Sequence, residues 1–264
     1  MTLRAAVRYL SDEWKTRPDR AFIYSKETRH QNTTKRDVTI TDARPLVADG
    51  AIDIERNGFT YSAYEPHVTD YTDGEAVKSS YETAIAPLLR ELTGAREVYV
   101  QNHQTRTEDP KTFLGAYSRY VHCDYPMTPN PDRVSNLLKA HGRENVDLEG
   151  LDYLWFNIWA PIDRPAEQNQ LTVIDASTLT DDDFQEYYFT PRAEGGFAAI
   201  PTWNRDHRFY YVANMRPGEA IVFKQYDSRP GMPKVCPHTA FYDPAVGEDH
   251  PGRRSVEFRA VCIL

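Results

Sequence analysis

The run Tyr120-Val121-His122-Cys123-Asp124, read together with His238 much later in the chain, constrains the fold more than any other feature. The run predicts a strand, and because side chains alternate along a strand, His122 and Asp124 share one face. His238 follows Val235-Cys236-Pro237, as at the end of a buried strand. If these three side chains act together, two strands far apart in sequence are neighbours, as the first and seventh core strands are in a jelly-roll barrel.

Two histidines and one carboxylate are the residue types that hold one face of an iron(II) ion. They leave the opposite face open for an organic co-substrate and O2. We therefore predict that His122, Asp124 and His238 are metal ligands for Fe(II). The alternative is a polar His-Asp pair on the surface of a sheet, because a His-x-Asp pair also arises by chance.

The segment 252–264 predicts the last strand of the chain. Alternation places Arg253, Ser255, Glu257 and Arg259 on one face, while the other face is mostly apolar. An Arg and a Ser two residues apart on one face can bind a carboxylate through charge-assisted hydrogen bonds, so we predict that Arg253 and Ser255 bind 2-oxoglutarate. The alternative is an exposed face on an edge strand, with Glu257 and Arg259 paired across it.

The composition narrows the class of partner and the compartment. The net charge of −8 and the pI near 5.5 argue against a nucleic-acid partner, which would require a basic face. No apolar run is long enough for a membrane span, and the N-terminus lacks a secretory pattern. Cys123, Cys236 and Cys262 have no paired spacing, so we expect reduced thiols in a cytoplasmic protein. The oligomeric state is left open.

The order of predicted elements indicates a mainly β fold with flanking helices, a double-stranded β-helix (jelly-roll, cupin-like) barrel. We expect one oxygenase domain over residues 1–264. Residues 1–50 would wrap the core, with an exposed turn at 33–37, and residues 51–264 would form the jelly roll and its support helices. The predicted helices are 75–93, ended by Gly94, and a short one that contains Leu137 and Leu138 and is ended by Gly142. The predicted strands are 96–100, 153–159, 170–175, 208–213 and 220–226.

Seven short motifs make the chain resemble a known family of small oxygenase-like proteins. This family includes gibberellin desaturases, aspergillic-acid-type hydroxylase/desaturases and a cephamycin methoxylation component. The motifs are Leu92-Thr93-Gly94-Ala95, Asn102-His103-Gln104-Thr105-Arg106, Val121–Tyr125, Phe156–Ile162, Tyr226-Asp227-Ser228, Pro237–Phe241 and Arg253–Arg259. Together they span roughly residues 55–264, and their joint order is far more specific than any one motif.

The resemblance implies chemistry that uses Fe(II), 2-oxoglutarate and O2. Two departures from the family's motifs mean that the substrate of a family member cannot be assigned to this chain. Ala160 stands where the family often has Arg, and Asn102-His103-Gln104 stands where it has an Asp-His-Thr type of run. We expect a small secondary-metabolite or amino-acid-like substrate that undergoes hydroxylation, desaturation or oxidative cyclisation.

The substrate contacts are predicted from residues that flank the proposed centre. Asn157 and Trp159 alternate inward on their strand, although a core Trp beside a satisfied Asn is an equally ordinary arrangement. The cations could bind an anionic group on the substrate, or could instead belong to surface ion pairs. The candidates are Asn157, Trp159, Arg106, Lys224, Tyr226 and Arg259.

Two other functions remain open at this point. One is a non-redox lyase or isomerase that uses another metal in the same barrel, which would not need the carboxylate anchor at Arg253 and Ser255. The other is a non-catalytic partner subunit that keeps the barrel for binding, against which the intact set of three ligands argues.

Overall fold

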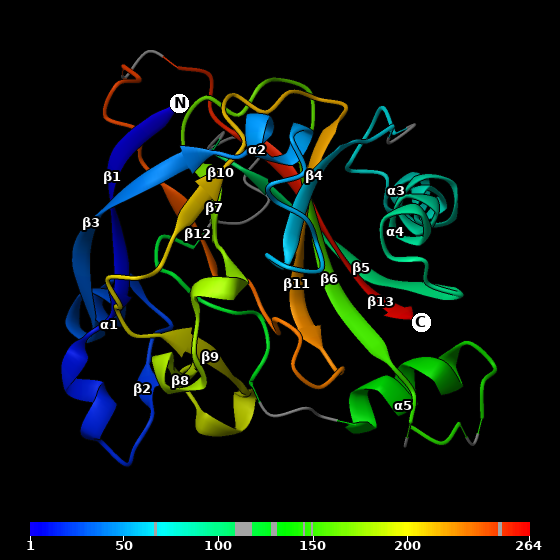
Figure 1. Cartoon of the computed structure of the whole chain (residues 1–264), viewed down its shortest axis with the longest axis horizontal. Helices are drawn as coiled ribbons and strands as arrows, with labels where there is room; N and C mark the ends of the chain where they lie inside the picture. The colour runs from blue at the N-terminus through cyan, green and yellow to red at the C-terminus, as the bar shows by residue number, and fades with distance from the viewer. Residues whose placement is uncertain (66–67, 109–117, 128–130, 145, 149, 248–249) are drawn as a thin grey trace.

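A computed structural model describes residues 1–65, 68–108, 118–127, 131–144, 146–148, 150–247 and 250–264 (Figure 1). Its main feature is a pair of five-stranded sheets. The first has the spatial order β1 (Thr2–Leu10), β3 (Thr33–Asp42), β10 (Phe209–Tyr211), β7 (Gln170–Ile174) and β12 (His238–Phe241). The second has the order β4 (Phe59–Ala63), β11 (Glu219–Asp227), β6 (Tyr153–Pro161), β13 (Arg254–Ile263) and β5 (Glu97–Thr107).

The two sheets pack face to face. Leu171 and Val173 of β7 share one buried apolar cluster with Trp159 of β6 and with Ile221 and Phe223 of β11. Alternating side chains from two facing sheets form such a core because each sheet has one apolar inner face. The mostly β, nearly closed barrel confirms the predicted jelly roll.

The sequence order of strands also explains how distant residues meet. β13, the last strand, lies between β6 and β5 in the second sheet. Its register pairs Ser255 with Pro161 and with Arg106. The alternative of an exposed edge strand for this segment is therefore wrong.

The predicted helix over 75–93 is present but is divided in three. It consists of α3 (Gly74–Ser80), a π-helical turn η2 (Tyr81–Ile85) and α4 (Ala86–Thr93). Pro87 explains the break, because it has no N–H to donate and its ring crowds the preceding turn. At the junction the Ala86 N–H reaches back five residues to the Tyr81 carbonyl. Gly94 ends the run at φ 69°, a left-handed conformation that glycine adopts without strain.

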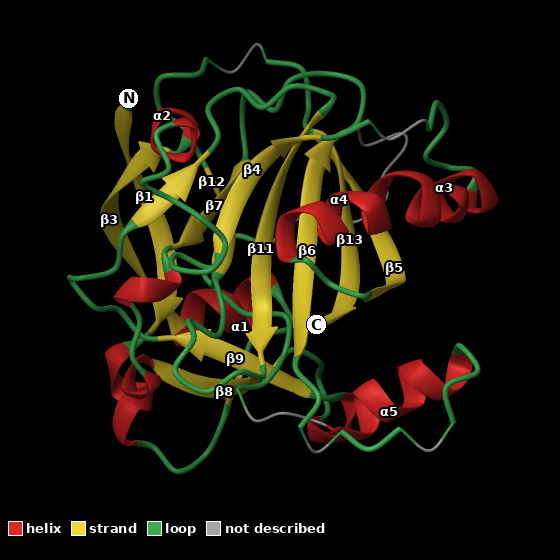
Figure 2. Cartoon of the chain, turned by 45° about the vertical axis from the view of Figure 1, so that its right-hand side comes forward, coloured by secondary structure: helices red, strands yellow, loops and turns green. Residues whose placement is uncertain are grey.

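This helical run covers the outer face of the second sheet. Figure 2 shows α4 lying across the strands β6 and β13. Its Leu88 and Leu89 are buried in one cluster with Phe156 and Phe258 from those two strands. The helix therefore supports the sheet from behind and leaves the inner face available for a site.

The remaining elements complete the picture. α5 (Pro131–Ala140) packs Val134 and Leu138 against Tyr153 and Val261, and the turn that follows it contains Gly142 as predicted. In the described residues no helix is long and apolar enough to cross a membrane. A third sheet contains β2 (Ala21–Phe22), β8 (Phe184–Tyr188) and β9 (Phe197–Pro201). The other helices are α1 (Lys26–Asn32), α2 (Arg44–Ala48) and the 3₁₀ turns η1 (Asp12–Thr16), η3 (Ala176–Thr178), η4 (Asp181–Asp183) and η5 (Ala193–Gly195).

The N-terminal region differs from the expectation in one respect. Residues 33–37, predicted as an exposed turn, form the start of β3 and pair with residues 6–10 of β1. The pairing satisfies the backbone while the polar side chains of this stretch remain largely exposed. The polar residues of this stretch led to the prediction of a turn, whereas they belong to a strand with one face toward water.

Candidate metal centre

The segment Tyr120–Asp124 is held by hydrogen bonds to four different parts of the fold. The N–H of Val121 donates to the Arg8 carbonyl of β1, and that of His122 donates to the His238 carbonyl of β12. The Cys123 N–H donates to the Ala199 carbonyl of β9, and the Asp124 N–H donates to Gln225 Oε1. Successive residues thus have different neighbours, so no continuous ladder forms. The predicted strand is reduced to a single bridge between His122 and His238.

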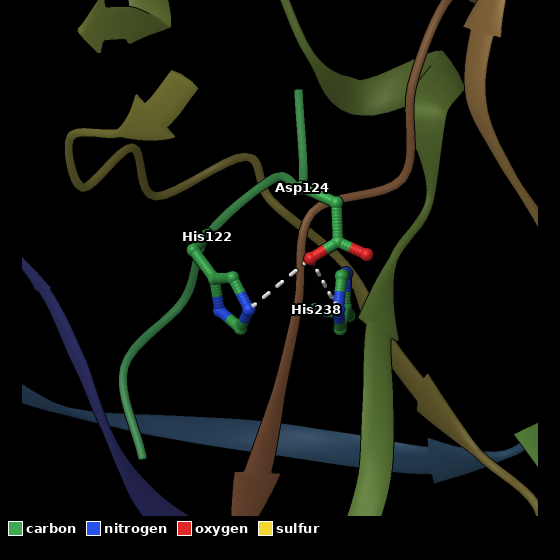
Figure 3. Close-up of side chains that lie close together, drawn as sticks. All are labelled: His122, Asp124 and His238. Atoms are coloured by element: carbon green, nitrogen blue, oxygen red, sulfur yellow. Dashed lines mark ion pairs between the residues drawn. The ribbon is translucent and has the colours of Figure 1, made fainter. Parts of the chain in front are cut away.

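The bridge brings the three predicted ligands together (Figure 3). Asp124 Oδ1 lies 3.8 Å from His122 Nε2 and 4.0 Å from His238 Nε2. One nitrogen or oxygen from each residue lies within 4.8 Å of the others. The prediction that the first ligand pair and the distant histidine meet is confirmed. His238 begins β12 rather than ending a strand as expected.

Both histidines are in a protonation state that leaves a ring nitrogen able to bind a metal ion. His122 Nδ1 lies 2.8 Å from the Tyr120 carbonyl, which can only accept, so Nδ1 carries the proton and Nε2 is left as a ligand atom. Burial lowers the pKa of His122 to about 4, and the neighbouring His238 contributes. Burial also lowers the pKa of His238. Both rings are therefore neutral near pH 7, as metal binding requires.

The two oxygens of Asp124 have different surroundings. Oδ1 faces the histidines, whereas Oδ2 accepts a hydrogen bond of 2.6 Å from Asn157 Nδ2 and lies 2.9 Å from an Arg259 nitrogen. Arg259 in turn donates to Glu257 Oε1 at 3.0 Å. With Oδ2 engaged in this way, Oδ1 is the oxygen available to a metal.

The charges around Asp124 keep it ionised. Burial alone would raise the pKa of this carboxyl, but the Arg259 guanidinium and the hydrogen bond from Asn157 hold it well below its usual range. By contrast, burial and the nearby Asp124 raise the pKa of Glu257, against the opposing effect of Arg259. A neutral–neutral–anionic ligand set of this kind suits a ferrous ion.

Arg253 and Ser255 lie on the inner face of the second sheet, as the alternation predicted. Arg253 is buried, donates to the Asn169 carbonyl at 2.6 Å, and lies over the ring of Trp159. The backbone N–H of Arg253 donates a hydrogen bond of 2.8 Å to Glu108 Oε2. The Ser255 hydroxyl is fully buried, and among the residues that the structure describes it has no hydrogen-bond partner. A buried cation and an unsatisfied hydroxyl on one strand fit a carboxylate ligand.

A cavity over the three predicted ligands contains several, but not all, of the predicted substrate contacts. Arg106, Trp159, Arg253, Glu257 and Arg259 line it together with His122, Asp124 and His238. The remaining described lining residues are Ser118, Leu171, Thr239 and Ala240.

Lys224 and Tyr226 require a correction, because neither is among the described residues that line this cavity. The Lys224 ammonium is completely buried and pairs with Asp227 at 2.6 Å. Tyr226 packs on Tyr153 in the cluster beneath α5. A bulge in β11 between Lys224 and Tyr226 shifts the register against β6, so simple alternation does not hold there.

Asn157 and Arg259 both contact Asp124 directly. Arg259 also lines the cavity, and a contact of either residue with a substrate stays a prediction. Arg106 donates to Gln104 Oε1 at 2.6 Å and remains at the cavity wall.

Two contributors to the site were not predicted. Gln225 accepts from the Asp124 N–H and donates to the Lys224 and Cys236 carbonyls, which joins the ligand segment to β11 and to the residues just before β12. Asn169 presents its carbonyl to Arg253 from a left-handed conformation at φ 51°. Neither residue belongs to a motif. The only local signal is that Asn tolerates positive φ better than most residues.

Comparison with known proteins supports the same chemistry. Residues 7–263 match a family described as an oxidoreductase/YMDC permease-like domain. The chain is 32% identical over 229 residues to the alpha-ketoglutarate-dependent dioxygenase phiK of Fungal sp. (strain ATCC 74256), covering 80% of this chain and 79% of phiK. It is 29% identical over 239 residues to the Fe(II)/2-oxoglutarate-dependent dioxygenase nvfI of Aspergillus novofumigatus (strain IBT 16806), covering 87% and 84% of the two chains.

A solved structure agrees with the fold over the whole length. The iron and alpha-ketoglutarate-dependent endoperoxidase NvfI superposes with a TM-score of 0.81 at 25% identity, covering 99% of this chain and 98% of that one. The relatives, the jelly roll and the convergence of two histidines with one aspartate point the same way. The chain belongs to the Fe(II)/2-oxoglutarate-dependent dioxygenases, enzymes that use Fe(II), 2-oxoglutarate and O2.

Proposed function

We propose that this dioxygenase binds Fe(II) through His122, Asp124 and His238. The observation that carries the proposal is the convergence of their ligand atoms within 4.8 Å at the His122–His238 bridge. The donor set fits the ion, because two neutral imidazoles and one carboxylate occupy one face and leave the other face open. Asp124 would bind through Oδ1, since Asn157 and Arg259 occupy Oδ2.

The co-substrate site of the proposal is formed by Arg253 and Ser255. The buried guanidinium would pair with the distal carboxylate of 2-oxoglutarate, and the unsatisfied Ser255 hydroxyl would donate to the same group. Asn169 and Glu108 hold Arg253 from its side chain and its backbone, so the guanidinium is oriented before the ligand arrives.

The bound iron and 2-oxoglutarate would supply, with O2, the oxidising chemistry, in which 2-oxoglutarate becomes succinate and CO2. The protein would orient the ligands, exclude water and position one C–H bond of the substrate. Arg106 and Trp159 at the cavity wall are the proposed substrate contacts.

The substrate class is proposed from the residues that form this wall. Charged Arg106 and apolar Trp159 and Leu171 suit a small organic molecule with a polar or anionic group. We propose a secondary metabolite or amino-acid-like compound. The named relatives include hydroxylase/desaturases such as efuI of Hormonema carpetanum, which is 26% identical over 255 residues. For this chain we propose that the substrate is hydroxylated, desaturated or oxidatively cyclised.

Two organisational proposals accompany the function. The strands from both ends of the chain contribute to the sheets that position the site, which supports a single domain over residues 1–264. All three cysteines are buried free thiols, which supports a reducing, cytoplasmic location.

The metal assignment is tested by iron content and turnover of the variants His122→Ala, Asp124→Ala and His238→Ala. Each removes one of three protein ligands, so each should lose stoichiometric iron and 2-oxoglutarate-dependent turnover while keeping the wild-type circular dichroism spectrum. Stoichiometric iron with normal turnover in any of the three would contradict the assignment. Cys123→Ala is the matched control, since Cys123 is buried between two of the ligands and would not coordinate.

A further inference from the structure

The elements β1, β3 and α1 lie on the side of the molecule away from α3 and α4 (Figure 1). A second concave surface lies beside them. It has a volume of about 820 Å³ and is bordered by β1, β3, α1 and the chain on either side of the metal ligands. We call it the basic hollow. Its walls carry the six cations Arg4, Arg8, Lys26, Arg29, Lys35 and Arg119, together with His30. Asp37 is the single acidic group among its described lining residues.

Most arginines outside the basic hollow pair with carboxylates, as Arg20, Arg44 and Arg229 do. Most cations of the basic hollow lack such a partner among the described residues. In the described part of the chain, no carboxylate oxygen lies within the 4.0 Å ion-pair distance of five of these cations. These five are Arg4, Arg8, Lys26, Arg29 and Lys35.

The arrangement also places like charges together. Arg8 and Lys35 lie directly opposite each other in the register of β1 and β3, a position where like charges repel across a sheet. The Arg29 Nε group is buried and has no hydrogen-bond partner among the described residues. The crowding lowers the pKa of His30, chiefly through Arg8 and further through its own partial desolvation and Arg29. Such a cluster costs stability unless an anion occupies it.

From the charge and size of the basic hollow, we propose that it binds the anionic group of a small molecule, such as a phosphate, a sulfate or a polycarboxylate. Its volume lies within the range of roughly 300–1,000 Å³ found for small-molecule pockets. With a net charge of −8, the chain as a whole repels anions, so this local reversal of sign would determine where an anion can bind.

The basic hollow adjoins the cavity over the three ligands. Ala240 lines both, and its N–H donates to the carbonyl of Ser118, which lines the cavity while the next residue, Arg119, lines the hollow. Arg119 also donates to Asn169 Oδ1 at 3.0 Å, and the Asn169 carbonyl holds Arg253. The bound anion would therefore be either the charged end of a substrate that reaches the cavity, or a free oxyanion that acts on the neighbouring site.

Anion binding can be tested without turnover, so its outcome is separate from that of the proposed function. Sodium tripolyphosphate and citrate are titrated calorimetrically into the wild type, at constant ionic strength, and into the double variant Arg29→Gln/Lys35→Gln. Lys35 makes no described side-chain hydrogen bond, and removing two crowded cations should leave the melting temperature equal or higher in polyanion-free buffer. The double variant should bind at least one probe about tenfold or more weakly.

The matched control is the double variant Arg192→Gln/Arg216→Gln, which changes the net charge equally at two exposed positions outside the basic hollow. It should retain wild-type binding. Equal weakening in both double variants, no binding of either probe by the wild type at millimolar concentration, or a lower melting temperature only for Arg29→Gln/Lys35→Gln would overturn the proposal. The proposal would also be overturned if the wild type sediments as a dimer and Arg29→Gln/Lys35→Gln sediments as a monomer. The basic hollow would then be a protein interface.

The two sources of the anion are distinguished by substrate-free conversion of 2-oxoglutarate to succinate. If tripolyphosphate changes the KM for 2-oxoglutarate in the wild type but not in Arg29→Gln/Lys35→Gln, the site takes a free oxyanion. If this background reaction is unaffected while the probe still binds, the site takes the anionic group of the substrate.

Discussion

Asp124 shows how much of the proposed chemistry depends on single atoms. Its Oδ1 faces two histidine nitrogens, and its Oδ2 is engaged by Asn157 and Arg259. Hydrogen bonds to the outer oxygen fix the orientation of a ligating carboxylate, and losing such partners typically costs about 10–100-fold in metal affinity or activity. We therefore propose that Arg259 acts on the metal through Asp124, as a positioning residue.

Replacing Arg259 tests this role. Arg259→Gln removes the cation that keeps Asp124 ionised beside the half-buried Glu257, so iron affinity should fall by about 10–100-fold. The measurement is competition for Fe(II) with a chelator under anaerobic conditions. Arg254→Gln on the same strand is the control, because Arg254 makes a partly exposed ion pair with Asp163 and should bind iron normally. Unchanged iron affinity in Arg259→Gln, with only a substrate KM raised, would restore Arg259 to substrate binding.

Replacing Arg253 should have the opposite pattern of effects from replacing Arg259: it should weaken 2-oxoglutarate binding and spare iron binding. Deleting one partner of a buried charge pair costs about 2–5 kcal/mol, so Arg253→Ala should raise the 2-oxoglutarate concentration for half-maximal turnover by roughly thirtyfold or more. Iron retention should be nearly unchanged, because the described contacts of Arg253 are to Asn169, Glu108 and Trp159 rather than to the three ligands. If Arg254→Ala gives this phenotype and Arg253→Ala does not, the assignment of the strand face is wrong.

At the scale of elements, the most local patterns were the easiest to predict from the sequence. The helix over 75–93, its stop at Gly94 and the strands β6, β7 and β11 follow from apolar spacing, and they are present. The π-helical turn before Pro87 and the bulge after Lys224 were not predicted, because both depend on how a segment fits its neighbours. Lys224 was expected at the site because its segment flanks the proposed centre, but its ammonium is buried against Asp227 instead.

The buried Lys224–Asp227 pair yields a prediction about stability. Both side chains are completely buried, and Asp227 also accepts from Arg229. Asp227→Asn leaves the Lys224 charge buried without its partner and should lower the free energy of unfolding by about 3–5 kcal/mol. Lys224→Met should cost less, because Asp227 keeps Arg229. Urea denaturation measures both, and an equal or larger loss in Lys224→Met would show that the ammonium, not the carboxylate, organises this cluster.

At the scale of the whole molecule, the sequence predicted the barrel and the convergence of the three proposed ligands because one geometric requirement links them. His122 and His238 can meet only if strands from distant parts of the chain are neighbours, and a jelly roll provides that arrangement. The basic hollow could not be predicted in this way. Arg8, Arg29, Lys35 and Arg119 come from separate elements, and nothing in their local sequence says that they share a surface.

The central claim is that one cavity, lined by His122, Asp124 and His238 and by Arg253, holds both the metal and 2-oxoglutarate. Anaerobic titration of the Fe(II) protein with 2-oxoglutarate tests it most directly, because chelation of an open iron site by this co-substrate gives a weak visible charge-transfer band. We predict a saturable band in the wild type, none in His238→Ala, and a band that needs far more 2-oxoglutarate in Arg253→Ala. No band in the iron-loaded wild type, or a titration unaffected by Arg253→Ala, would contradict the account.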